Sequence, residues 1–124
     1  MQSLEKVNLG IQELVMNQPT INGIALMSKE GLIIQSALDD SNEDFVAAAG
    51  AILYHLGTST LECLQKGSTD MVFVKGVNGY IIVSAVSRDI IMLVSTSTSE
   101  IQIGTLMFEV KEAIKKFGDL NLNF

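Results

Sequence analysis

The chain has 124 residues, 48% of them hydrophobic, and its mean hydropathy of +0.36 is too high for a disordered protein. We expect one domain over residues 1–124, large enough to bury its own core. A net charge of -6 argues against a nucleic-acid partner, because affinity for phosphates rests on clustered Lys and Arg. The single cysteine, Cys63, cannot form an internal disulfide and is consistent with a reducing cytosol. No apolar run is long enough to insert into a membrane, so we expect a cytoplasmic protein.

The first part of the chain predicts a helix and then two strands. Apolar residues recur at helical spacing over residues 4–15, and Pro19 ends this helix. Two runs rich in β-branched and apolar residues come next, at 21–27 and 32–37. They are joined by a short turn in which Gly31 can take a positive φ.

A long helix is predicted over residues 42–65. Ser41 and Asp44 resemble a capping box with aspartate in place of glutamate. Gly67 is the expected left-handed cap at the other end. The acidic residues around the helix start complement the helix dipole: Asp39, Asp40, Glu43 and Asp44.

The second half predicts three strands and a last helix. Strands at 71–75 and 79–86 flank a loop that ends in Asn78-Gly79, a strong hairpin signal. The strand at 90–96 begins with an unbroken apolar run, typical of a central strand covered on both faces. Apolar residues at helical spacing predict the last helix over 103–117.

These elements predict an α/β fold with three layers, α/β/α, around a five-stranded antiparallel sheet. The element order is α-β-β-α-β-β-β-α. We expect the first and last helices on one face of the sheet and the long helix on the other. The strand at 71–75 then lies at an edge, and residues 119–124 form a loose tail.

The long helix has more apolar surface than one sheet can cover, and it divides into three stripes at 100° per residue. The stripe expected to face the core consists of Phe45, Ala49, Ile52, Leu56 and Cys63. The stripe expected to face a second chain consists of Val46, Gly50, Leu53, Gly57 and Leu64. The stripe expected to face outward, toward a further partner, consists of Ala47, Ala51, Tyr54, Thr58 and Glu62.

Two glycines in the second stripe point to a close approach of another backbone. A glycine inside a helix costs about 1 kcal/mol relative to alanine, so Gly50 and Gly57 call for a reason. A two-fold partner helix is one explanation, and a tight core within the chain is the other.

The edge strand is a second candidate for self-association. An apolar edge strand presents unpaired backbone groups that can pair with another chain. The residues expected to do so are Met71, Val72, Phe73 and Val74.

No group of residues predicts catalysis, a metal site or a cofactor. The only histidine, His55, lies in the middle of the long helix, too far from Cys63 to share a metal with it. Lys66 precedes Gly67, the wrong order for a phosphate-binding loop. The hydroxyl run at 95–99 could bind an anion before the last helix, or could simply cap that helix. We therefore predict that the protein is not an enzyme.

Several of these features together resemble the roadblock domain, the dynein light chain family. The first of them is the run Gly23-Ile24-Ala25-Leu26-Met27-Ser28-Lys29-Glu30-Gly31-Leu32-Ile33-Ile34. The small-residue helix segment 47–51, the hairpin at 76–79, the strand at 90–94 and the closing helix come after it in the family's order. Glu30 stands where the family more often has aspartate. The resemblance covers about residues 4–117 and implies the roadblock fold, a profilin-like architecture.

The resemblance also implies a function. Roadblock domains form homodimers or heterodimers by pairing their long helices and joining their edge strands. They serve as scaffolds or regulators of Ras-like small GTPases. We expect a dimeric adaptor that binds such a GTPase and pairs with itself or a related roadblock chain. Two alternatives remain open: a sensory module that binds a small ligand, and a scaffold subunit of the motor light-chain type.

Overall fold

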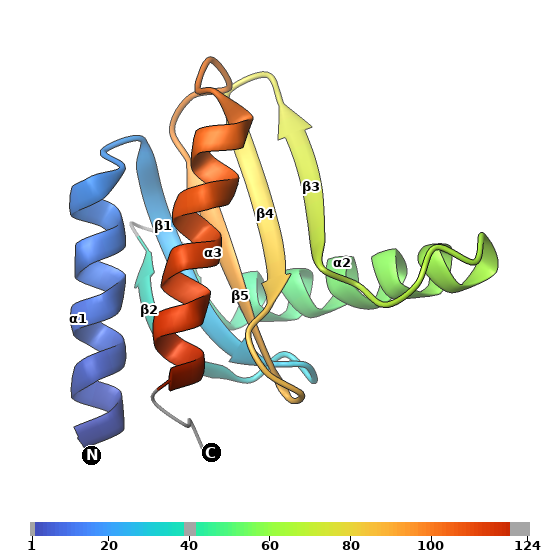
Figure 1. Cartoon of the computed structure of the whole chain (residues 1–124), viewed down its shortest axis with the longest axis horizontal. Helices are drawn as coiled ribbons and strands as arrows, with labels where there is room; N and C mark the ends of the chain where they lie inside the picture. Colours follow the sequence, from blue (N-terminus) through green and yellow to red (C-terminus); the bar gives the residue numbers. More distant parts are fainter. Residues whose placement is uncertain (1, 39–41, 120–124) are drawn as a thin grey trace.

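The computed structural model describes residues 2–38 and 42–119 (Figure 1). The elements have the predicted order, with boundaries within about two residues of those expected over most of the chain. In chain order they are α1 (Gln2–Asn17), β1 (Ile21–Ser28), β2 (Ile33–Leu38), α2 (Glu43–Cys63), β3 (Met71–Gly76), β4 (Gly79–Ala85), β5 (Ile90–Thr96) and α3 (Ile103–Asp119).

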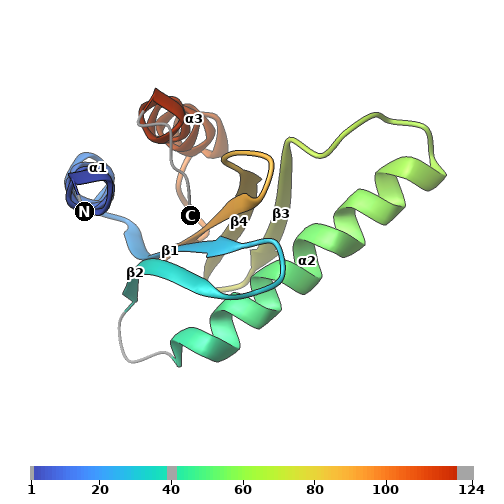
Figure 2. The same cartoon turned by 90° about the horizontal axis from the view of Figure 1, so that it is seen from below.

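The strands form one antiparallel sheet in the order β2-β1-β5-β4-β3. Helices α1 and α3 lie on one face, and α2 crosses the other (Figures 1 and 2). The predicted three-layer fold is confirmed, with β5 at its centre and β3 at an edge. The apolar run that opens β5 is buried from Ile90 to Val94, as a central strand requires.

The face covered by α1 and α3 holds the larger core. Helix α3 buries the apolar stripe that its sequence predicts, including Leu106 and Phe117. The Phe117 ring lies so close to Gly10 of α1 that a Cβ there would be 2.7 Å from the ring. That contact explains a glycine inside α1, where it otherwise weakens the helix.

The ends of α2 differ from the prediction. Asn42 is the N-cap, and its side-chain oxygen accepts a hydrogen bond from the N–H of Phe45. The left-handed residue that caps the helix is Gln65, with φ of 57°, whereas Gly67, which also has a positive φ of 93°, lies beyond the cap. The N–H of Lys66 returns to the carbonyl of Leu61, so the helix closes in a Schellman motif that ends it before Gly67 is reached.

Some predicted features lie outside the described residues. Ser41, Asp39 and Asp40 are among them, as are residues 120–124 of the expected tail. Asp119, the first residue of that tail, is instead the last residue of α3.

A candidate interaction surface on α2 and β3

Helix α2 lies close to the sheet because small residues face it. Ala47 and Ala51 are buried, and a Cβ on Gly50 would lie 3.0 Å from Met27 Sδ. A Cβ on Gly57 would lie 2.6 Å from Val72 Cγ2. The two glycines therefore permit close packing within the chain. Of the two explanations for them, a partner helix and a tight core within the chain, the structure supports the tight core.

The stripe expected to face the core faces solvent instead. Phe45 is 74% exposed, Ile52 66% and Leu56 63%. Cys63 is also exposed, and Ala49 is half-buried. The prediction that this stripe packs on the sheet is wrong, because the side of the helix that carries Ala47, Ala51 and Tyr54 packs there instead. We call Phe45, Ile52 and Leu56 the outward row.

The stripe expected to face outward packs on the sheet instead. Ala47, Ala51 and Tyr54 are all buried. Thr58 is half-buried and its hydroxyl is 2.5 Å from that of Thr69, so of this set only Glu62 is exposed. The orientation predicted for these residues is wrong, and their burial removes the reason for placing a partner on them.

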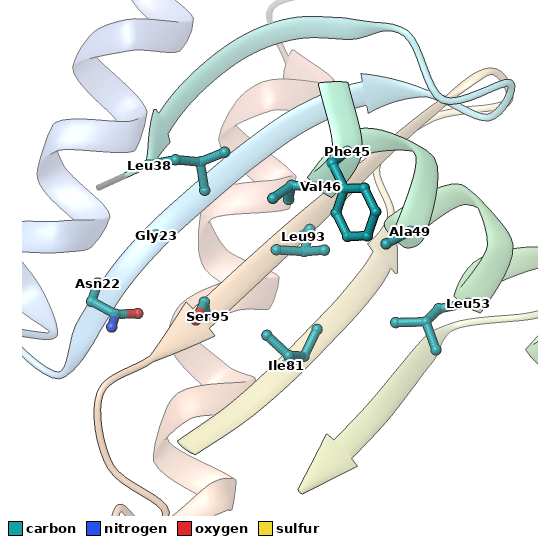
Figure 3. Close-up of a pocket in the computed structure, with 10 residues that line it drawn as sticks. All are labelled: Asn22, Gly23, Leu38, Phe45, Val46, Ala49, Leu53, Ile81, Leu93 and Ser95. Carbon is teal, nitrogen blue, oxygen red and sulfur yellow. The ribbon is translucent and has the colours of Figure 1, made fainter. Parts of the chain in front are cut away.

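In the remaining stripe, Gly50 and Gly57 lie against the sheet, and the larger residues face a part of the sheet that α2 leaves uncovered. Val46 and Leu53 are half-buried there, and Leu64 is 63% exposed beyond the sheet. Between this side of α2 and the strands lies an apolar groove of about 280 Å³ (Figure 3). Its walls are Phe45, Val46, Ala49 and Leu53 of α2 and, from the strands, Asn22, Gly23, Leu38, Ile81, Leu93 and Ser95.

The sequence did not indicate the groove residues of the strands. Ile81 and Leu93 belong to strands that are apolar on both faces. This pattern predicts that helices cover both faces of the sheet, but it does not show how much of each face a helix covers. The small residues Gly23 and Ser95, register partners on adjacent strands, were the available signal, because small side chains leave room above a sheet.

The C-terminal end of α2 extends past the β3 edge (Figures 1 and 2). Gly57 lies over Val72 of this edge strand, so residues 58–63 continue beyond it for about 9 Å. That overhang is about two strand spacings long. A second groove runs beside it, lined among others by Leu53, Leu61 and Val74.

The two sheet edges differ in their ability to pair. Strand β2 carries an irregularity where Leu26 and Met27 of β1 pair with Gln35 and Ile33, which leaves Ile34 as an extra residue. Strand β3 pairs with β4 in unbroken register over its whole length. Bulges obstruct edge pairing, so β3 is the edge better suited to receive another strand.

The polar residues near α2 have structural roles. The His55 Nε2 atom lies 2.8 Å from the carbonyl oxygen of Lys29, which ties α2 to the β1–β2 turn. The Lys29 ammonium lies over the Tyr54 ring, 5.2 Å from its centroid. Within residues 2–38 and 42–119, His, Cys, Asp and Glu form no group of three that could hold a metal ion. No helix in that part of the chain is long and apolar enough to cross a membrane.

Comparison with known proteins agrees with this architecture. The sequence model of the Roadblock/LC7 domain family matches residues 8–96, which is most of the chain. The chain belongs to the Roadblock/LC7 domain family. No curated protein sequence matches it.

Solved roadblock structures share its fold. A Roadblock/LC7 domain from Streptomyces avermitilis is 24% identical, with a TM-score of 0.81 over 90% of this chain and 94% of the other. Myxococcus xanthus MglB is 15% identical, with a TM-score of 0.83 over 93% and 94%. The gliding protein MglB from Thermus thermophilus is 11% identical, with a TM-score of 0.85 over 97% and 91%.

Proposed function

We propose that this protein is a non-enzymatic, dimeric adaptor that binds a Ras-like small GTPase and modulates its activity or placement. Membership of the roadblock family supports the proposal, since the resemblance implies this role. The observation that carries it is the outward row, in which three large apolar side chains of α2 are 63% to 74% exposed, Phe45 among them at the rim of the groove. Exposed apolar patches of this kind mark interaction sites.

A second copy, or a related roadblock chain, approaches from the β3 edge and from the uncovered side of α2. Leu53 and Val46 line that side, and the exposed Leu64 follows the last residue of the overhang. Phe73 and Val74 of the edge strand are 40% and 41% exposed. Association there removes apolar surface from water, worth about 25 cal/mol per Å² before the costs of binding.

The GTPase binds the outward row. Ile52 lines neither of the two grooves, so a partner that covers them leaves it accessible, whereas Phe45 and Leu56 each line one of them. In a two-fold dimer the two rows lie on one side of the assembly and form a larger surface. Residues near the centre of an interface carry most of its binding energy, which makes Ile52, between Phe45 and Leu56 along the row, the main anchor.

The test is titration of the host's Ras-like GTPases against Ile52→Ser, in the GDP form and in a form loaded with a GTP analogue. We expect a loss of at least about 1 kcal/mol of binding, a several-fold change, with dimer mass unchanged. Phe108→Ser is the matched control, because Phe108 is 60% exposed on α3 and should leave binding unaltered. Wild-type affinity of Ile52→Ser in both nucleotide states would refute the outward row as the site.

The groove of Figure 3 favours one other function, the binding of a small apolar ligand. Its volume of about 280 Å³ is near the lower end for ligand sites. Asn22 and Ser95 supply its polar side chains. Native mass spectrometry of the purified protein distinguishes the two functions. A bound ligand adds its own mass to that of the protein, whereas a dimer without ligand has twice the mass of one chain.

A further inference from the structure

We infer that β3 pairs with β3 of a second copy in one register only, with Phe73 on the two-fold axis. This inference rests on the proposed dimer and specifies which backbone groups and side chains meet across it. Three observations on β3 select the register: the direction of its backbone groups, the face of each side chain, and the place where α2 crosses it.

The β3–β4 hairpin fixes the direction of the backbone groups. A two-residue loop closes on a hydrogen-bonded pair, here Gly76 and Gly79, and such pairs alternate along an antiparallel ladder. Residues 72, 74 and 76 therefore bond to β4. The Asp70 carbonyl continues the pattern by accepting from the N–H of Ala85 at 3.4 Å. Hence Met71, Phe73 and Lys75 direct their N–H and C=O groups toward the free edge.

The side chains of β3 alternate between the two faces of the sheet. Val72 packs under α2, and Met71 packs against the core on the opposite face. Residues directly opposite each other in an antiparallel pair share a face. A continuous sheet therefore pairs odd-numbered residues of β3 with odd-numbered residues of its copy, so that one residue lies opposite itself on the axis.

Of the three central positions of β3, an axis at Phe73 pairs the largest number of backbone groups on the free edge. With Phe73 on the axis, Met71 lies opposite Lys75 of the second copy, and every outward N–H and C=O of β3 has a partner. With Val72 on the axis, Lys75 lies opposite a residue that precedes the strand. With Val74 on the axis, Met71 lies opposite Val77 in the hairpin loop. Both alternatives leave outward groups unpaired, which is costly when the interface excludes water.

The position of α2 favours the same register. Helix α2 crosses β3 over Val72. The overhang of one copy therefore crosses the β3 strand of the other copy at the residue that lies opposite Val72. An axis at Val72 places both helices over the same residues, where they collide. An axis at Phe73 separates the crossings by two residues, about 7 Å, and an axis at Val74 by about 14 Å. The Phe73 register is closest to the 8–10 Å spacing of packed helices.

In this register the overhang of the second copy reaches the edge of the groove of Figure 3. It crosses Val74 and, at about two strand spacings, ends near Ile81, the register partner of Val74 on β4, next to Ser95, the partner of Ile81 on β5. Ile81 and Ser95 line the groove of Figure 3. Leu64, exposed in one chain, is then the apolar side chain available to enter it.

Cysteine cross-linking tests the register. In a Cys63→Ser background, Phe73→Cys alone should shift from monomer to covalent dimer on a non-reducing gel after mild oxidation. Met71→Cys and Lys75→Cys should each stay monomeric alone, because their copies lie about 14 Å apart along the ladder, beyond the reach of a disulfide. A mixture of those two variants should cross-link, because Met71 of one copy faces Lys75 of the other.

Other outcomes overturn the inference and separate it from the proposed dimer. Cross-linking between Met71→Cys and Phe73→Cys chains, and not at Phe73→Cys alone, places the axis at Val72. The same result with Phe73→Cys and Lys75→Cys places it at Val74. A dimer by light scattering that cross-links in none of these combinations excludes β3 pairing and leaves dimerisation intact. A monomer overturns the register and the dimer together.

Discussion

The two faces of the sheet are covered by helices of opposite design. Helix α3 packs large side chains such as Phe117 and Leu106 inward, while α2 packs mainly small residues, Ala47, Gly50 and Ala51, inward beside Tyr54 and exposes Phe45. The difference shows what helical periodicity reports. A strong apolar stripe marks the core only where the chain buries that stripe by itself. In α2 the chain does not bury the apolar stripe, and the small residues face the core instead.

The largest effect should come from the core on the α1/α3 face. Phe117→Ala removes a fully buried ring that packs on Gly10, so we expect a loss of about 3–5 kcal/mol in the free energy of unfolding. Urea denaturation measures it. Phe108→Ala, an exposed site on the same helix, is the control and should change stability little. Similar losses in both variants would contradict the assigned face of α3.

A smaller effect should come from the close approach of α2. Gly57→Ala places a methyl group against Val72, a side chain that rotates little to make room, and overpacking of this kind costs about 1–3 kcal/mol. Gly104→Ala is the control, because no atom lies within 4 Å of a Cβ there. Adding Val72→Ala to Gly57→Ala should recover part of the loss. Full stability of Gly57→Ala would mean that α2 does not lie this close to β3.

A still smaller effect should come from proline substitution in β3, the edge strand of the sheet. Phe73→Pro removes an outward N–H and spares the ladder to β4, so it should weaken self-association by about 1 kcal/mol with an unchanged circular dichroism spectrum. Val72→Pro removes an N–H that bonds to β4 and should destabilise the fold itself. Sedimentation velocity separates the two results. Unaltered association of folded Phe73→Pro would exclude this edge from the interface.

The smallest effect concerns the α1–α3 contact. A hydrogen bond from the Lys116 ammonium to Glu13, 2.8 Å long, and the charge of Glu13 raise the pKa of Lys116 above its ordinary 10.5. Its contribution to stability is therefore complete below pH 10.5 and is lost as pH rises through the raised pKa. Glu13→Gln should lower the pKa of Lys116 in an NMR titration, with little change in stability because the pair is exposed. An unchanged pKa would show that the pair does not form in solution.

The sequence predicted the fold well because each element carries its own local signal. Pro19, the loop before Gly79 and the apolar run of β5 depend only on neighbouring residues. The roles of the α2 stripes were predicted less well. Helical spacing shows which residues share a stripe, but not which side of the helix packs on the sheet, so it did not show whether Ala47 or Phe45 faces inward. The cap at Asn42 was missed because adjacent polar residues can each cap a helix.

The central claim is that the exposed apolar surface of α2 and β3 belongs to an assembly. Sedimentation equilibrium of the wild-type protein tests it most directly, with Leu53→Asp as the matched variant, because Leu53 lies on the uncovered side of α2. We expect the wild type at about twice the 13.4 kDa mass of one chain and a folded Leu53→Asp shifted toward the mass of one chain. A wild type that stays at the mass of one chain, up to the highest concentration at which it remains soluble, would contradict the account.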